Sequence, residues 1–373
     1  MQKHYIRICT NKMKRKPDFK NGIFHGKPIY VLAVILLTVL LVISILTAVT
    51  IGSVDLSVKD VYSVILYKVF GIGDPEVYGV GAMSDIVWFI RLPRILLATA
   101  VGMGLAVAGV VMQAIVKNPI ADPYILGISS GASLGATVAI FLGVGAVFGS
   151  NSIGICAFIG AFLTSVLVQI TANIGGRANS VRLLLAGTAL GSVCSAFSNF
   201  VVYIAGDRDG IQTVTFWLMG SLAGAKWENL AVIIPCVFIA TLFFCTQSRI
   251  LNMMLLGDEV SITLGTDLHR YRQVYLVVTA LLIGFVVYSA GIIGFVGLII
   301  PHVVRMFFGT DHKKMLPLSA LSGSIFLIWA DVASRIIIPK SEVPIGILVS
   351  MIGAPCFIYL LVRRSYGFGG EKS

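Results

Sequence analysis

Charged side chains are scarce in this sequence: Asp, Glu, Lys and Arg make up 12% of its 373 residues, against about 25% in ordinary soluble domains. Hydrophobic residues reach 57%, which is more than one soluble core could bury in a chain of this length. About ten membrane spans of roughly 20 residues each would accommodate nearly all of them. The composition therefore excludes a soluble enzyme, a disordered chain and a nucleic-acid-binding protein.

Sequence motifs for catalysis and metal binding are also absent. The six cysteines include no CxxC pair, and five of them lie inside apolar stretches, so neither a disulfide framework nor a metal site is predicted. The five histidines lack ligand spacing, and no HExxH, GxSxG or Walker-type phosphate-binding motif occurs. We therefore expect no metal, no cofactor and no catalytic residue in this chain. If ATP drives its function, another chain must bind the nucleotide.

Apolar runs of membrane-spanning length follow one another along the chain. Residues 1–28 are polar and basic, and residues 29–51 form the first run, which is too long for the core of a typical secretory signal peptide. Nine further runs bring the predicted number of transmembrane helices to about ten. They cover residues 95–116, 125–148, 153–174, 181–203, 230–245, 274–292, 293–308, 316–337 and 344–362. The sequence thus predicts an all-α polytopic membrane protein.

The distribution of Lys and Arg predicts the orientation of these spans, because cytoplasmic loops of membrane proteins are enriched in both. With the N-terminus inside, the inner segments hold 20 of the 28 Lys and Arg residues, and the outer segments hold the other 8. We therefore expect both termini in the cytoplasm. The expected organisation is a basic tail at residues 1–28, a single transmembrane domain at 29–364 and a short tail at 365–373.

Glycine is abundant, with 39 residues, and several pairs have the GxxxG spacing that lets membrane helices approach closely. Such pairs lie at residues 131–135, 187–191 and 220–224. Two spans are interrupted by Pro and Gly, at residues 118–124 and 291–302. Breaks at membrane depth need protein or a water-filled cavity around the freed backbone groups. Corresponding breaks in two halves of a transporter are typical of a translocation path.

Three long motifs carry a resemblance to a known family. They are Arg91-Leu-Pro-Arg94, the run from Asn118-Pro-Ile-Ala-Asp-Pro-Tyr to Gly131, and Gly294-Phe-Val-Gly-Leu-Ile-Ile-Pro301-His302. With shorter matches between about residues 30 and 364, the sequence resembles the FecCD family, the membrane permeases of ABC importers for iron-siderophores, haem and cobalamin. The resemblance implies a non-catalytic multi-pass subunit in the plasma or inner membrane of a prokaryote.

The resemblance also implies partners: a second permease copy or a paralogue, two cytoplasmic ABC ATPase subunits, an extracytoplasmic solute-binding protein, the metal-chelate substrate and membrane lipid, but no nucleic acid. A ferric siderophore is the first expectation for the substrate, with haem and cobalamin as alternatives. An ion-coupled secondary transporter is a rival of a different class. It would need several ionisable groups inside its spans, and apart from Asp331, His302 and Arg305 the predicted spans hold almost none.

The polar segment at about residues 249–272 belongs to the longest loop on the predicted inner side, and it reads as two short helices joined at Gly257. Acidic residues stand where the second helix would begin, and the helix dipole favours them there. In the family that the sequence resembles, this segment couples the permease to the ATPase. The resemblance assigns the coupling contact to Leu256, Gly257, Glu259, Leu264 and Gly265. An ordinary solvated loop is the alternative.

Three arginines, Arg91, Arg94 and Arg335, lie near the predicted outer ends of the spans. The resemblance implies that they bind acidic residues of the solute-binding protein, which suits Arg because its planar fork pairs with carboxylates. Binding of lipid phosphate is the alternative. Asp331 is the only acidic residue well inside a predicted span and stands four residues before Arg335. We therefore expect a structural ion pair between these two residues rather than a proton relay.

A cytoplasmic gate is implied at two inner turns. The resemblance assigns one part of the gate to Asn118 and Ile120 and the second part to Asn179 and Ser180. Helix capping is the alternative for the first pair, because Asn before Pro is a usual start of a turn. His302 is expected to be a packing residue.

Overall fold

The computed structural model describes residues 24, 26–52, 54–174, 176–338 and 341–363, and within these ranges the regular structure is entirely helical. Each of the ten predicted spans contains one apolar helix, so the all-α polytopic prediction is confirmed. The helices are α2 (Lys27–Thr50), α6 (Leu92–Val116), α7 (Ile128–Leu142), α8 (Ser152–Asn173), α9 (Ser180–Ala205), α11 (Trp227–Thr246), α14 (Leu268–Ala290), α15 (Val296–Phe308), α16 (His312–Ile336) and α17 (Ile345–Arg363). Most of the two predicted tails lies outside the described residues.

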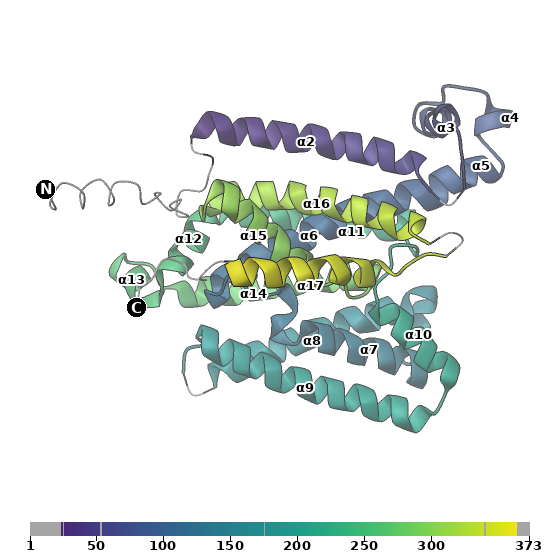
Figure 1. Cartoon of the computed structure of the whole chain (residues 1–373). Coiled ribbons are helices and arrows are strands. Elements are labelled where there is room, and N and C mark those ends of the chain that lie inside the picture. The colour runs from purple at the N-terminus through teal and green to yellow at the C-terminus, as the bar shows by residue number, and fades with distance from the viewer. Residues whose placement is uncertain (1–23, 25, 53, 175, 339–340, 364–373) are drawn as a thin grey trace, which may run out of the picture.

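Shorter elements lie at the two ends of this bundle (Figure 1). One end carries α12 (Ser248–Leu256) and α13 (Asp258–Thr263), together with the start of α2 and the end of α17. We call it the α13 end. The opposite end, the α3 end, carries five short elements. They are α3 (Val58–Phe70), α4 (Pro75–Tyr78), α5 (Ala82–Asp85), the π-helix η2 (Ile86–Arg91) and α10 (Arg208–Leu218).

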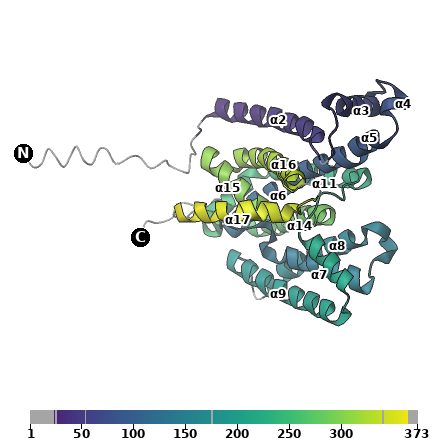
Figure 2. The same ribbon diagram turned by 45° about the vertical axis from the view of Figure 1, so that its right-hand side comes forward.

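Helix α6 is the centre of the bundle. It is buried along most of its length and packs against α11, α14, α15 and α16. Its many Ala, Gly and Val residues explain this position, because small side chains on all faces let several helices approach at once. Helix α2 is the opposite case: it lies along α16 at the edge of the bundle (Figures 1 and 2), and most of its apolar side chains are exposed, as lipid contact requires.

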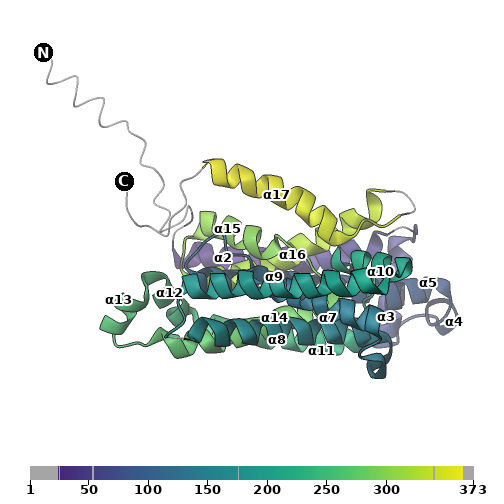
Figure 3. The ribbon, with the colours of Figure 1, turned by 90° about the horizontal axis from the view of Figure 1, so that it is seen from below.

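Helices α7, α8 and α9 pack together as a lobe that α14 connects to the rest (Figures 2 and 3). The glycine pair at 131–135 packs against α8, where Gly131 meets Gly160, and the pair at 187–191 packs against the backbone of residues 125–127. The pair at 220–224 does not join two helices. It lies in the loop between α10 and α11, where Gly220 has a positive φ of 70° and Gly224 has no neighbour within contact distance.

The two interrupted spans meet inside the bundle. A Cβ atom on Gly297 would lie 2.4 Å from the ring of Pro123, and one on Gly109 would lie 1.8 Å from the carbonyl oxygen of Gly297. The side chain of Gln113 donates to that same carbonyl at 3.3 Å and accepts from Arg305 at 2.5 Å. The broken backbone therefore finds its polar partners within the protein, as its depth in a membrane demands.

Gly109→Ala tests this close approach. The added methyl group has no space against the Gly297 carbonyl, so α6 and α15 must separate, and we expect the free energy of unfolding to fall by about 1–3 kcal/mol. Thermal melting of the purified protein in detergent measures the change. Gly224→Ala is the matched control, because a Cβ atom there meets nothing within 4 Å. Equal melting temperatures for the two variants would contradict the packing described here.

Candidate functional site

Helices α12 and α13 project from the α13 end of the bundle (Figure 3). They form the two short helices expected from the sequence, and Gly257, with a φ of 103°, separates them. Large apolar side chains are exposed on this pair: Leu256, Val260, Ile262 and Leu264 are each between 45% and 61% exposed. Glu259 and Gly265 are exposed beside them. A cluster of exposed apolar residues bordered by an acid is typical of a surface that binds another protein.

Polar contacts hold α12 against the start of α16. The amide of Asn252 donates to Asp311, the residue that caps α16, at 2.9 Å. The carbonyl oxygen of the same amide accepts from the backbone N–H of His312 at 2.9 Å and lies 2.7 Å from its Nδ1. This half of the projecting segment is therefore fixed to a membrane-spanning helix.

The other half is held through Arg272, near the start of α14. Its guanidinium donates to Asp258, the first residue of α13, at 2.6 Å and to the carbonyl oxygen of Ala178 at 3.0 Å. Lys117 Nζ lies 3.9 Å from the same carboxylate of Asp258. No role was predicted for Arg272, because it falls in the polar segment at about residues 249–272 that was expected to lie in a loop, whereas α14 already begins at Leu268. Asp267 could have indicated the true start of α14, because Asp is a common N-cap residue. Its side chain accepts from the backbone N–H of His269.

An exposed ion pair lies close to this contact. Arg177 and Asp267 approach to 3.2 Å and connect the loop before α9 with the loop before α14. The backbone N–H of His269 donates to the Asp267 carboxylate and, together with Arg177, keeps the pKa of Asp267 below its usual range. The carboxylate is consequently ionised at neutral pH.

The predicted gate residues lie at two neighbouring turns of the α13 end. Asn118 Oδ1 accepts from the backbone N–H of Ile120, so this Asn starts an Asx turn, whereas the helix that follows is capped by Asp122; Ile120 is 37% exposed. Asn179 caps α9 by accepting from the backbone N–H of Arg182. Ser180 Oγ lies 3.4 Å from the carbonyl oxygen of Ile115. The two turns are thus brought together, and gating by these four residues stays a prediction.

The three arginines predicted to dock a partner are buried at the α3 end, with exposed fractions of 3% to 6%. Arg91 donates to the carbonyl oxygens of Val49, Thr50 and Val54. Arg335 donates to the carbonyl oxygen of Ile51. Both arginines therefore supply hydrogen-bond donors to carbonyl groups at the C-terminal end of α2. Both guanidinium groups are thus bonded within the chain. Docking through them stays a prediction that would require the arginines to exchange these internal bonds for bonds to a partner.

Asp331 is fully buried between two of these arginines. Its carboxylate lies 2.8 Å from Arg94 Nε and 3.2 Å from Arg335 Nε, so the expected pair with Arg335 is present and a second arginine joins it. Arg94 also binds Glu342 at 2.8 Å, in the loop before α17. Sequence reasoning missed both contacts of Arg94, because Asp331 and Glu342 lie 237 and 248 positions from it along the chain and no local spacing indicates such contacts.

A stripe of uncharged polar residues runs along one exposed face of α9. Thr188, Ser192, Ser195 and Asn199 recur at helical spacing, and each is exposed in the single chain. Polar side chains within a membrane span usually face a protein or a water-filled space rather than lipid. This face of α9 is therefore expected to be covered by something other than the residues described here.

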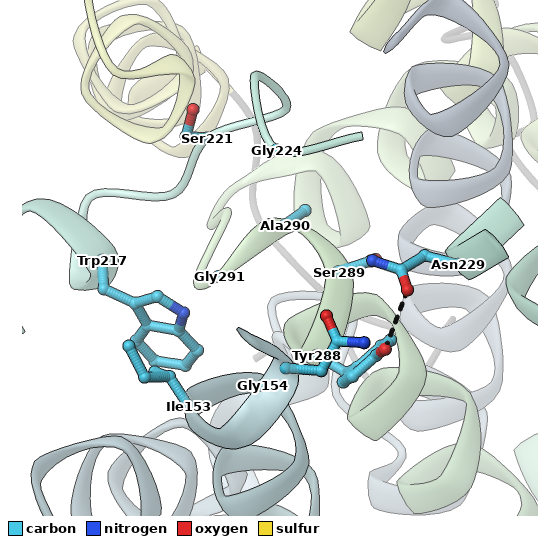
Figure 4. Close-up of a pocket in the computed structure, with 11 residues that line it drawn as sticks. Ile153, Gly154, Trp217, Ser221, Gly224, Asn229, Tyr288, Ser289, Ala290 and Gly291 are labelled. Atoms are coloured by element: carbon cyan, nitrogen blue, oxygen red, sulfur yellow. Dashed lines mark hydrogen bonds between the residues drawn. The ribbon is translucent and has the colours of Figure 1, made fainter. Parts of the chain in front are cut away.

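A cavity of about 240 Å³ opens at the α3 end (Figure 4). Trp217 and Ile153 line one side, and Tyr288, which donates to Asn229 at 3.0 Å, lines the other. Among the described residues that line it, none is Asp, Glu, Lys, Arg or His. The cavity therefore lacks the charged groups that would bind an ionic substrate.

These features define a polytopic membrane protein with an exposed apolar surface on a projecting segment at one end and a polar face along one span. Residues 40–363 match the model of the FecCD transport family, and the chain belongs to that family. It is therefore a permease subunit of an ABC transporter in a prokaryotic inner membrane. Such subunits are not catalytic, and the ATPase activity lies in partner subunits.

Individual relatives agree with this assignment. The chain is 37% identical over 332 residues to the uncharacterized ABC transporter permease protein YvrB of Bacillus subtilis, covering 88% of this chain and 92% of the relative. It is 40% identical over 279 residues to the vitamin B12 import system permease protein BtuC of Salmonella typhimurium, covering 75% and 84%. A solved inward-facing structure of a metal-chelate type ABC transporter matches with a TM-score of 0.76 and 32% identity, covering 89% of this chain and 99% of that one.

Asp331→Asn tests the buried charge cluster. Removing the carboxylate charge leaves Arg94 and Arg335 buried without their shared partner, and we expect a loss of about 3–5 kcal/mol in the free energy of unfolding. Melting of the detergent-solubilised protein measures it. Asp209→Asn, the same change at an exposed acid of α10, is expected to have little effect. A melting temperature for Asp331→Asn equal to that of Asp209→Asn would show that the cluster does not stabilise the fold.

Proposed function

We propose that this permease, paired with a second copy or a paralogue, carries a metal chelate into the cytoplasm. A ferric siderophore is the first candidate. Two cytoplasmic ABC ATPase subunits would drive transport, and an extracytoplasmic solute-binding protein would deliver the chelate. The α13 end would lie in the cytoplasm with both chain termini. The excess of Lys and Arg in the segments assigned to the inside supports this orientation.

The uncharged polar face of α9 carries the proposal. Its hydroxyl and amide groups would line a path between two permeases. The hydroxyl groups of Thr188, Ser192 and Ser195 already donate within the chain, so water and the other subunit would satisfy their free acceptor sites and the Asn199 amide. A path without charges holds a passing solute weakly, and weak binding is what release on the far side requires. The selective contacts would then be made by the solute-binding protein, which suits cargo as large as a metal chelate.

The projecting segment at the α13 end is the proposed contact with the ATPase. Its exposed residues Leu256, Val260 and Leu264 would enter an apolar groove, with Glu259 at the rim. Because α12 and α13 are bonded to the starts of α16 and α14, movement of the ATPase would reach the membrane-spanning helices directly.

Cobalamin is a second candidate substrate, because a relative that is 40% identical is a vitamin B12 import permease. The two substrates can be separated by uptake into liposomes that contain the permease, the ATPase and the solute-binding protein of the same system. We expect ATP-dependent accumulation of radiolabelled ferrichrome and none of radiolabelled cyanocobalamin. Accumulation of cyanocobalamin alone would assign cobalamin transport, and accumulation of neither would exclude ferrichrome and cobalamin as substrates.

Bulky residues at the first predicted gate turn provide a further test. Asn118→Trp and Ile120→Trp would obstruct a narrow opening, so we expect uptake to fall at least about tenfold, the effect of roughly 1.4 kcal/mol on a barrier, while basal ATP hydrolysis continues in the partner subunits. Leu142→Trp, on the exposed α3 end of α7, controls for the insertion of a large aromatic side chain. Uptake equal to that of the parent would contradict gating at this turn.

A further inference from the structure

Arg272 is an unusual residue for the position that it occupies. It lies in the first turns of α14, and only 3% of it is exposed although it carries a full charge. Burial of an arginine is costly unless its donors find well-placed acceptors. Two acceptors are present, and they belong to different parts of the protein: the Asp258 carboxylate at 2.6 Å and the Ala178 carbonyl oxygen at 3.0 Å.

The two acceptors lie at the ends of elements with different proposed roles. Asp258 is the first residue of α13, in the segment proposed to contact the ATPase. Ala178 directly precedes Asn179 and Ser180, the second predicted gate turn, from which α9 begins. A single guanidinium therefore connects the projecting segment with the start of the helix that carries the polar stripe.

The other contacts between these parts are weaker. The pair of Arg177 with Asp267 is exposed, with 68% and 49% of the two side chains accessible, and exposed pairs contribute little. Lys117 stands 3.9 Å from Asp258, at the limit of an ion pair. Among the residues that the structure describes, Arg272 alone combines burial, a short bond to a carboxylate and a second bond to the backbone of the gate turn.

We infer that Arg272 is the positioning residue that transmits movement of α13 to the gate turn at residues 178–180. This inference rests on the proposed function and adds the route by which the ATPase would control the gate. Displacement of α13 moves the Asp258 carboxylate, and the rigid planar fork of Arg272 moves the Ala178 carbonyl with it. A lysine at this position would keep the charge, but its single ammonium group cannot hold both acceptors in the same geometry.

The test uses the permease purified with its ATPase subunits in lipid nanodiscs, in a background without native cysteines. Ser180→Cys reports the gate through its rate of reaction with a hydrophilic maleimide, with and without ATP and vanadate. We expect Arg272→Lys to reduce the nucleotide-dependent change in this rate by about fivefold or more, the lower range of coupling between distant sites. Nucleotide trapped by vanadate is measured in the same samples, because it reports the ATPase alone.

Arg270→Lys is the matched control, since it makes the same chemical change on the same helix at an exposed residue. It is expected to behave like the parent. Asp258→Asn provides a second variant that weakens the link from the other side and leaves Arg272 bonded to Ala178. We expect the same loss, and the double variant should lose no more than either single one, because both changes act on one contact.

A nucleotide-dependent change in Arg272→Lys equal to that of the parent would overturn the inference. It would also be overturned if Arg272→Lys and Asp258→Asn had additive effects, since they would then act independently. A defect in folding alone would lower trapped nucleotide and gate response together and would count against a transmitting role. Chelate uptake by the parent complex tests the proposed function separately, so the function can stand when this route fails.

Discussion

The scarcity of hydrogen-bonding partners inside a membrane is the constraint on which the rest of this structure depends. The polar groups at a break in a span need partners from protein or from a water-filled cavity, and in this chain the two interrupted spans meet each other. The carbonyl of Gly297 accepts from Gln113, and the glycines at 109 and 297 allow the backbones to come close enough. Satisfying the broken backbone therefore also places α15 against the central helix α6.

The same constraint explains the arginines at the α3 end. The last carbonyl groups of a helix have no partner within that helix, and for α2 the guanidinium groups of Arg91 and Arg335 supply one. The charge of Arg335 is balanced by Asp331, which Arg94 also contacts. The cluster therefore joins α2, α6, α16 and the loop before α17 into one unit, and stabilises this end whether or not a partner binds there.

Hydrophobic run length predicted the positions of the ten apolar helices, because a span must match the thickness of the membrane. It did not predict α10, a short amphipathic helix whose first turn is polar, nor the early start of α14, where Asp267 caps a helix that begins before the apolar run. Of the site, α12 and α13 could be predicted from Gly257 and the acids that follow it. The contacts of Arg94 with Asp331 and of Arg272 with Ala178 could not, because they join residues 237 and 94 positions apart.

Gly257 divides the projecting segment into halves with different anchors. On one side, Asn252 holds α12 to Asp311 and His312 at the start of α16, a helix that packs along the central α6. On the other side, Asp258 holds α13 to Arg272 and, through it, to the turn before α9. The Gly257 backbone has a φ of 103°, which residues with a side chain rarely adopt, so glycine makes this joint without strain. In the proposed coupling, displacement of α13 would pass through Arg272 to the start of α9, and so to the lobe of α7, α8 and α9 that carries the polar stripe.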